Sequence, residues 1–192
     1  EGYGGDGGLA TDAILNQPRG LFVDREGSVW IADSNNHRIR KVDGRTGMIS
    51  TVIGIGEAGF LGDDGPGLSA RINVPEVVFV DSSGRVYIGD QLNRRIRKVD
   101  GLSGRIQTLA GDGFAEFFGD GDFAWNASIR DVRGLFVDAD GSVFIGDEDN
   151  NVVRAIQGST GIIFSIAGTG IRGYTGDVGP ATDARLNDPK GV

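Results

Sequence analysis

The chain has 192 residues, of which 34 are glycine and 39% are hydrophobic, enough to build a buried core and to exclude a disordered or collagen-like polypeptide. It contains no cysteine and one histidine, His37, so it has neither a disulfide framework nor an intrachain histidine pair for a catalytic metal. The net charge of −8 disfavours nucleic acid and anionic membrane surfaces as partners, and no apolar run approaches the roughly 20 residues of a membrane span.

The sequence repeats itself with a period of 57 residues. Three versions of one apolar string end in aspartate: Gly-Leu-Phe-Val-Asp at Asp24, Val-Val-Phe-Val-Asp at Asp81 and Gly-Leu-Phe-Val-Asp at Asp138. No insertion or deletion interrupts the step, and self-similarity at a fixed period is typical of solenoids and propellers. We therefore predict one partial propeller domain over residues 1–192. Its repeat units are 1–57, 58–114 and 115–171, followed by the start of a fourth at 172–192.

Within the first unit, short apolar runs alternate with tight turns, which is the pattern of antiparallel strands. We expect strands at 20–24, 29–33, 37–43 and 48–53. About 25 residues then follow, too many for a tight turn, so this stretch must cross from the outer edge of one blade to the inner strand of the next. The predicted fold class is all-β, a β-propeller of four-stranded antiparallel blades with about three blades present.

Two strings carry a resemblance to a known family. Val-Trp-Ile-Ala-Asp-Ser-Asn-Asn-His-Arg-Ile-Arg-Lys-Val at 29–42 and Gly-Tyr-Thr-Gly-Asp-Val-Gly-Pro-Ala-Thr at 173–182 resemble NHL repeats. They are most similar to the long-loop variety of bacterial secreted or surface proteins and of teneurin-like cell-surface propellers. The resemblance implies a six-bladed ring, which at this repeat length needs about 340 residues, so the chain supplies half of a ring. It also implies an extracellular or cell-surface location.

Half of a ring needs further blades to cover its flanks. Three isolated blades would expose the apolar faces of the first and last sheets, which soluble proteins do not leave bare. We expect the remaining blades either from the same longer chain or from a second copy in a symmetric dimer. The longer chain is favoured, because Val192 falls within a predicted inner strand, where a domain boundary is unusual.

An aspartate at the end of the second strand and an arginine on the third strand recur in all three units. The pairs are Asp33 with Arg40, Asp90 with Arg97, and Asp147 with Arg154. Because a catalytic group is normally needed once per ring, this regular recurrence indicates a structural ion pair that locks each blade. We assign no catalytic residue to the chain.

A glycine-aspartate loop also recurs and offers candidate calcium ligands, since a hard cation binds several oxygens of a flexible loop. The candidates are Asp63, Asp64, Asp120 and Asp122. In the alternative interpretation each aspartate caps its own turn, flanked by glycines with positive φ. That alternative is favoured, because none of the loops has the spaced carboxylates and closing glutamate of a calcium loop.

The third unit differs from the others in its aromatic and acidic residues. Residues 115–171 hold 9 acids and 3 bases, and we expect their long loop and the turn after the second strand to share one rim, with Asp120, Asp122, Glu148 and Asp149 in one acidic patch. Extra aromatic residues suggest a protein-binding surface. The predicted binding rim comprises Phe118, Phe123, Trp125, Glu148 and Asp149. Asn126-Ala127-Ser128 is a sequon for N-glycosylation.

The leading functional hypothesis is a noncatalytic scaffold that recognises another protein or a surface glycan through this rim. The alternative is a metal-dependent lyase or lactone hydrolase of a six-bladed propeller, with catalytic residues largely in blades outside this sequence. Enzymes of that kind hold their metal at the central channel, whereas His37 lies in the predicted third strand. RNA binding needs a basic rim, which this acidic sequence lacks.

Overall fold

The computed structural model describes residues 2–192, so Glu1, the first residue of the predicted unit 1–57, lies outside the described residues. The first sheet contains β1 (Pro18–Val23), β2 (Val29–Asp33), β3 (Arg38–Val42) and β4 (Ile49–Ile53). The second contains β5 (Pro75–Val80), β6 (Val86–Asp90), β7 (Arg95–Val99) and β8 (Ile106–Ala110). The third contains β9 (Val132–Val137), β10 (Val143–Asp147), β11 (Val152–Ile156) and β12 (Ile163–Ala167).

Single-turn 3-10 helices interrupt the loops. They are η1 (Ala10–Asp12), η2 (Ser34–Asn36), η3 (Gly67–Ser69), η4 (Gln91–Asn93), η5 (Ala124–Asn126), η6 (Glu148–Asn150) and η7 (Ala181–Asp183). No helix within residues 2–192 is long and apolar enough to cross a membrane.

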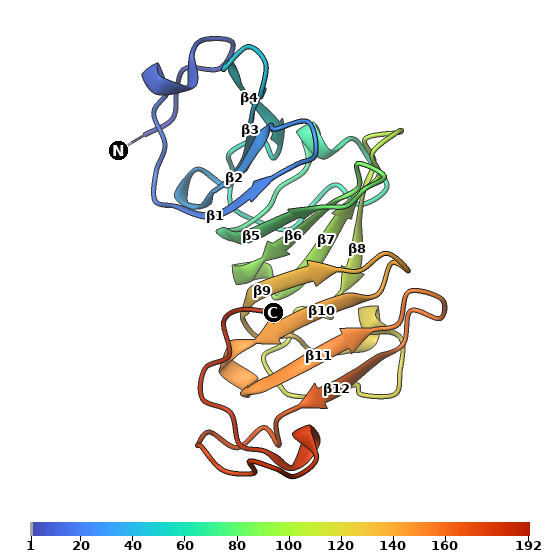
Figure 1. Cartoon of the computed structure of the whole chain (residues 1–192). Helices are drawn as coiled ribbons and strands as arrows, with labels where there is room; N and C mark the ends of the chain where they lie inside the picture. The colour runs from blue at the N-terminus through green and yellow to red at the C-terminus, as the bar shows by residue number, and fades with distance from the viewer. Residues whose placement is uncertain (1) are drawn as a thin grey trace. The chain divides into compact units, whose positions relative to one another are not determined.

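Each sheet is an antiparallel meander whose strands follow one another in chain order, as Figure 1 shows. Tight turns join the strands, and Gly27 and Gly47 adopt φ values of 77° and 70° there, which only glycine reaches without strain. The prediction of an all-β fold built from four-stranded antiparallel blades is confirmed. The inner strands β1, β5 and β9 begin at residues 18, 75 and 132, in step with the sequence repeat.

The chain divides into two compact units. The first comprises Glu1–Asn93 and Arg97–Gln107, and the second comprises Arg94–Ile96 and Thr108–Val192. The first unit holds the blade β1–β4 together with most of the blade β5–β8, and the second holds the blade β9–β12.

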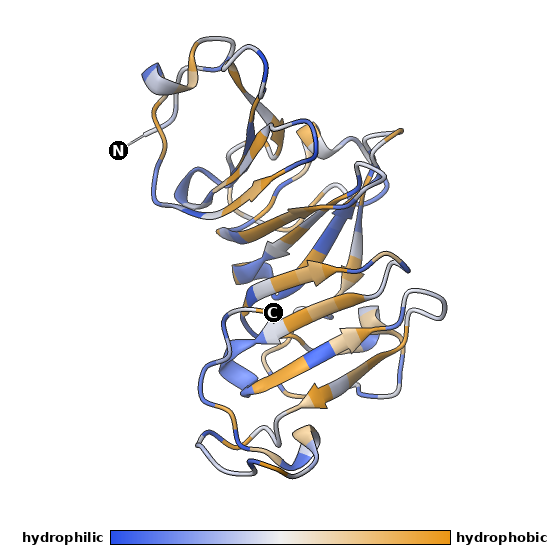
Figure 2. Cartoon of the chain, viewed as in Figure 1, coloured by the Kyte–Doolittle hydropathy of each residue, from blue (hydrophilic) through white to orange (hydrophobic). Residues whose placement is uncertain are grey.

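The hydrophobic core of the first compact unit forms between the blade β1–β4 and the next blade, whose inner strand is β5. Trp30, Ala32 and Ile39 of the first blade join Val78 and Val80 of β5 in one buried cluster. Strand alternation explains this cluster, because every second residue of β5 points to the same face. Figure 2 shows hydrophobic residues gathered on the strands, interrupted by hydrophilic segments, whereas the loops are mixed.

The long loop before each blade runs along the outer edge of that blade. In the third blade, Gly121 N–H donates to the Ile163 carbonyl at 2.8 Å, and Ile163 N–H donates to the Asp122 carbonyl at 3.0 Å. Equivalent bonds join the loop at Gly7 and Gly8 to Ile49 of β4. The loop therefore pairs with the outermost strand of each blade and protects an edge that would otherwise be open.

Candidate functional site

A buried arginine lies at the centre of the first blade. Arg40 of β3 is completely buried and places Nη1 3.3 Å from Asp33 Oδ2. Its Nε and Nη2 atoms lie 3.0 and 2.5 Å from Oδ1 of Asp6, an aspartate of the glycine-rich loop. Nη2 also donates to the Gly4 carbonyl at 3.2 Å, and the guanidinium lies over the ring of Tyr3 at 4.8 Å. One side chain thus ties the loop to two strands.

The other two blades repeat this arrangement. Arg97 Nη1 lies 3.3 Å from Asp90 Oδ2 and its Nη2 lies 2.5 Å from Asp63 Oδ1. In the third blade, Arg154 Nη2 lies 2.6 Å from Asp120 Oδ1, while Nη1 lies 4.0 Å from Asp147 Oδ2. Phe60 and Phe117 take the place of Tyr3 over the guanidinium group, at 4.8 and 5.3 Å. We call each of these groups an arginine anchor; its members are the arginine, the two aspartates and the aromatic ring.

The strand aspartate of each anchor binds a backbone N–H group and an asparagine side chain in addition to the arginine. In the second blade, Asp90 Oδ1 accepts from Asn73 N–H at 2.6 Å and Oδ2 accepts from Asn93 Nδ2 at 2.8 Å. Burial outweighs these bonds and the charge of Arg97, and it raises the pKa of Asp90 to about 6. Burial likewise raises the pKa of Asp147. A buried aspartate of this kind stays ionised inside the blade only with the positive charge of its arginine beside it.

The anchors engage two of the candidate calcium ligands. Asp63 and Asp120 each direct Oδ1 toward a guanidinium group, and Asp120 Oδ2 accepts from Ser165 N–H at 2.9 Å. In the first blade the matching carboxylate, Asp6, is affected by burial, which raises its pKa, and by hydrogen bonds from Tyr3, Thr51 and Arg40, which together lower it below the ordinary value. These aspartates thus bind a guanidinium group of the protein itself, in the loops that were considered as calcium sites.

The remaining calcium candidates lie in exposed parts of the same loops. Asp64 Oδ1 accepts from Gln107 Nε2 at 2.7 Å, and Asp122 Oδ1 accepts from Phe123 N–H at 2.6 Å. Over the described part of the chain, no group of three or more histidine, cysteine, aspartate or glutamate side chains is placed to hold a metal ion. Calcium binding at these loops stays a prediction.

The aromatic residues of the predicted rim form a stacked pair. The rings of Phe123 and Trp125 lie 4.4 Å apart and nearly parallel, with an interplanar angle of 8°. Their side chains remain 43% and 50% exposed, and the backbone at Phe123 bridges to Ile162 beside the β11–β12 turn. Phe118 is also exposed but bridges to Ser128, farther along the loop. We call Phe123 and Trp125 the aromatic pair.

The acidic residues of the predicted rim lie elsewhere and are already paired. Glu148 Oε2 lies 2.7 Å from Arg133 Nε, and Asp149 Oδ2 lies 3.2 Å from Arg130 Nε. Lys190 Nζ lies 3.4 Å from Glu148 Oε1. Nearby bases therefore offset the negative charge of this turn.

The loop contacts the η6 turn at one end of the blade, where Arg130 pairs with Asp149, whereas the aromatic pair lies at the other end of the loop. Glu148 and Asp149 belong to η6, at the end of β11 where Val152 begins, whereas the aromatic pair lies by Ile163, which pairs with Ile156 at the other end. Five residues of strand span about 13 Å. The loop leaves the η6 end and follows the edge of β12. One acidic patch of Asp120, Asp122, Glu148 and Asp149 stays a prediction.

The sequon at Asn126 lies beside the aromatic pair. Asn126 is exposed in η5, and its Nδ2 lies 3.4 Å from Asp122 Oδ2. Ser128 is buried and donates its hydroxyl to Asp112 Oδ2 at 2.9 Å. Glycosylation of Asn126 stays a prediction.

The sequence interpretation missed two partners of each anchor, although both recur at the repeat step. The loop aspartates Asp63 and Asp120 were considered as calcium ligands or turn caps. Together with Asp6 they are spaced by 57 residues, which could have paired them with the equally spaced arginines. The asparagines that bind the strand aspartates also recur. They are Asn36, Asn93 and Asn150.

Comparison with known proteins finds similarity to proteins that contain NHL repeats. The family model of the Teneurin NHL domain matches residues 1–60. Human Teneurin-1 is 30% identical over 213 residues, covering 98% of this chain and 8% of that protein. NHL repeat-containing protein 2 of Bos taurus is 28% identical over 214 residues, covering 96% of this chain and 29% of that protein. The chain thus spans less than a third of either relative.

Among solved structures, a Bacteroides thetaiotaomicron structural genomics protein of unknown function aligns with a TM-score of 0.71. The alignment covers 92% of this chain and 42% of that chain at 16% identity, so the likeness concerns the fold alone. Three antiparallel four-stranded blades with a common repeat define the chain as a segment of a β-propeller. Its repeats are NHL repeats, as the sequence predicted, and over residues 1–60 they are similar to the teneurin NHL domain.

Proposed function

We propose that this propeller segment is a noncatalytic recognition module that binds another protein through the aromatic pair of the third blade. The observation that carries the proposal is the parallel stack of Phe123 and Trp125, which leaves about half of each side chain exposed. Large, rigid aromatic side chains are the residues that most often anchor protein interfaces. A location outside the cell or at its surface, which the resemblance implies, is part of the same proposal.

The repeat itself supports a special role for this pair. The equivalent positions are Leu9, Pro66 and Pro180 for Phe123, and Thr11, Leu68 and Thr182 for Trp125. Folding of a blade therefore does not require two aromatic rings here. Asp122 beside the pair and the acid excess of residues 115–171 favour a partner segment that combines apolar and basic residues.

A phage-displayed library of random peptides tests this proposal. We expect peptides enriched on the 192-residue chain to contain apolar and basic residues and to lose at least about tenfold in affinity on Trp125→Ala. Trp125→Leu introduces the second unit's residue and should weaken binding as well, because the flat ring is lost. Leu68→Ala, which alters the equivalent exposed position of the second unit, is the matched control and should leave binding unchanged.

The proposal fails if no peptide is enriched, or if the enriched peptides bind Trp125→Ala and the parent equally well. Binding of an array of surface glycans that depends on Trp125, without peptide binding, would also overturn it in favour of a glycan ligand. Circular dichroism of each variant shows that a loss of binding does not come from unfolding.

We propose further that other blades cover the open face of β1. Leu21 and Val23 are 67% and 60% exposed on that face, while the equivalent Val78 and Val80 of β5 are buried under the first blade. A face of this composition is normally covered by a neighbouring blade in repeat proteins. The relatives, which are several times longer than this chain, favour a longer polypeptide as the source of that blade.

A further inference from the structure

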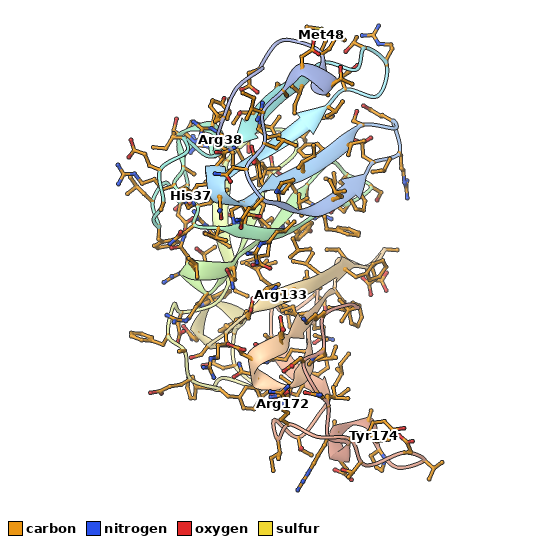
Figure 3. The ribbon with its side chains drawn as sticks, turned by 90° about the vertical axis from the view of Figure 1, so that its left-hand side faces the viewer. His37, Arg38, Met48, Arg133, Arg172 and Tyr174 are labelled. Atoms are coloured by element: carbon orange, nitrogen blue, oxygen red, sulfur yellow. The ribbon has the colours of Figure 1, made fainter. Side chains whose placement is uncertain are left out.

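The single histidine connects the first blade to the second. His37 follows η2 directly and adopts a left-handed conformation with φ 52°. Its Nδ1 atom accepts a hydrogen bond from the backbone N–H of Val74 at 3.1 Å. Val74 lies immediately before β5, the inner strand of the second blade. Figure 3 labels His37 and the neighbouring Arg38 where the chain leaves η2 for β3.

The residue that His37 holds is strained. Val74 has a φ of 50°, in the left-handed region that a β-branched side chain rarely adopts. Such a conformation is unfavourable and persists only where its surroundings enforce it. The bond from Val74 to His37 is one of these constraints, because it fixes the peptide N–H that the left-handed turn directs toward the first blade.

The repeat provides an internal comparison in the second compact unit. Asn151 occupies the position of His37, and its Oδ1 accepts from the backbone N–H of Asp188 at 3.2 Å. Asp188 occupies the position of Val74 and has the same left-handed conformation, with φ 51°. Two repeats after His37, Asn151 therefore accepts a hydrogen bond from the residue equivalent to Val74. The amide oxygen of Asn151 does not titrate, so it accepts this bond at any pH.

The remaining pair of positions lacks an acceptor. Arg94 takes the place of His37 and carries only hydrogen-bond donors. Asp131 takes the place of Val74 and does not adopt a positive φ. Gln17, the equivalent residue before β1, is also left-handed with φ 48°, although no described blade precedes β1. The acceptor therefore fixes the N–H of this residue, whereas the left-handed conformation also forms without it.

His37 differs from Asn151 because it titrates. Nδ1 accepts a hydrogen bond only while it is unprotonated; the imidazolium form carries N–H at both nitrogens and would present a donor to the Val74 donor. We propose that His37 is a pH-sensitive latch between the first two blades, which holds the start of β5 while Nδ1 is unprotonated and releases it on protonation.

The surroundings of His37 place its protonation in the acidic range. Burial and the positive charge of Arg38 lower the pKa of His37 below its ordinary value of 6.5. Arg38 is held beside it by bonds to the Asn36 and Ile55 carbonyls, at 3.1 and 2.7 Å. The segments 34–36, 54–56 and 73–74 carry no titratable side chain. β1 contacts η2 and β5 contacts β3, and the charged residues Arg19 of β1 and Glu76 of β5 form an ion pair with each other. Asp33, which precedes η2, is bound by Arg40 and Asn36.

The sign of the effect follows from this lowered pKa. The folded chain binds a proton at His37 less readily than the unfolded chain, so the contribution of His37 to stability is complete above the unfolded pKa of 6.5. It is lost as the pH falls below 6.5 toward the folded pKa. The loss is local at first, because it acts on the junction at Val74 and leaves the strand ladders intact.

Amide hydrogen exchange of the 192-residue chain tests the latch at Val74. We expect the protection of the Val74 N–H to fall about tenfold or more between about pH 7.5 and about pH 5, after correction for intrinsic exchange. His37→Asn introduces the acceptor of the third unit and should keep that protection across the range. Asp90, whose pKa is raised to about 6, is present in both proteins, so its own titration cancels in the comparison.

Two further measurements keep the proposal falsifiable. Nitrogen chemical shifts of the His37 ring at about pH 7.5 should show the proton on Nε2, and a proton on Nδ1 would overturn the latch. His37→Phe should give low Val74 protection at every pH; if it does not fold, His37→Asn and the ring shifts still decide. Equal pH dependence of Val74 protection in the parent and in His37→Asn would also overturn the proposal.

Discussion

The first and second blades share a sequence pattern but differ in how much of it is covered. In β1, Leu21 and Val23 are 67% and 60% exposed, whereas in β5 the equivalent Val78 and Val80 are 2% and 7% exposed. The blade β1–β4 covers the face of β5, and no described residue covers the same face of β1 to that extent. Burial in this fold is therefore decided by the neighbouring blade as much as by the residue itself.

The arginine anchors differ from the strand faces in this respect. Arg40 and Arg97 are both completely buried, although only one of their two blades has a covered inner face. Each anchor is built from residues of its own repeat unit, so it does not depend on a neighbour. A blade thus contains one structural element that is complete in itself and one that needs a partner.

The largest effect is expected from breaking an anchor. Arg97→Met leaves Asp90 buried without its guanidinium partner, and removing one partner of a buried ion pair costs about 3–5 kcal/mol in the free energy of unfolding. Arg40→Met should cost a similar amount, because Asp33 has the same environment in the first blade. Urea denaturation of both variants measures the two losses.

A double variant is the control for the anchor prediction. Asp90→Asn added to Arg97→Met should regain part of the lost stability, because no buried charge is then left unpaired. A loss below about 1 kcal/mol for Arg97→Met, or a loss that differs strongly between Arg97→Met and Arg40→Met, would show that the anchors are not equivalent and self-contained.

A smaller loss of stability should distinguish the covered face of β5 from the exposed face of β1. Val80→Ala removes buried methyl groups and leaves a cavity, at a cost of about 2 kcal/mol. Val23→Ala, the matched change on the exposed face of β1, should alter the free energy of unfolding by less than about 0.5 kcal/mol. Equal losses for the two variants would contradict the difference between the faces.

The same pair of variants sharpens the proposal for the missing blades. If another blade of a longer polypeptide covers β1, the 192-residue chain should have a thermal midpoint that does not depend on protein concentration, and Val23→Ala should stay mild. If a second copy covers β1, the midpoint should rise with concentration and Val23→Ala should weaken the dimer. The second result would replace the longer chain with a dimer as the source of the blades.

The strands were predictable because their information is local and repeated. Val29–Asp33 and its equivalents carry the apolar runs and turn residues of a strand, and the 57-residue step aligns them without gaps. The strand aspartate and the arginine of each anchor were recognised for the same reason. The exposure of Leu21 follows from the place of β1 in the first blade, as the repeat count predicted, and not from the residues of β1 themselves.

The site was less predictable because its loop is held by backbone bonds. Residues 121–124 pair with residues 161–163 through main-chain groups, which leave no pattern in the side chains. The path of the loop, and with it the separation of the aromatic pair from Glu148 and Asp149, was therefore not visible in the sequence. The latch at His37 was equally hidden, since it depends on the backbone N–H and the left-handed φ of Val74.

The smallest effect concerns the opposite face of β1, which approaches β5 closely. A Cβ atom added at Gly20 would lie 2.6 Å from the Glu76 carbonyl oxygen and 2.8 Å from Val77 Cα. The φ of Gly20 is not positive, so the backbone itself would accept alanine, and Gly→Ala without a clash stabilises by about 0.4–1 kcal/mol. The contact with the β5 backbone reverses that sign, and Gly20→Ala should destabilise by about 1 kcal/mol.

Gly4→Ala is the matched control for this change, because the added Cβ would meet only Ile14 Cδ1, at an ordinary 3.8 Å. Its effect should be neutral or slightly stabilising in the same urea titration. If Gly20→Ala were as harmless as Gly4→Ala, β1 and β5 would not be in tight contact, and the covered face of β5 would owe its burial to β2 rather than to β1. If only Gly20→Ala lowers the free energy of unfolding, then one face of β1 packs closely against β5 while its other face is exposed.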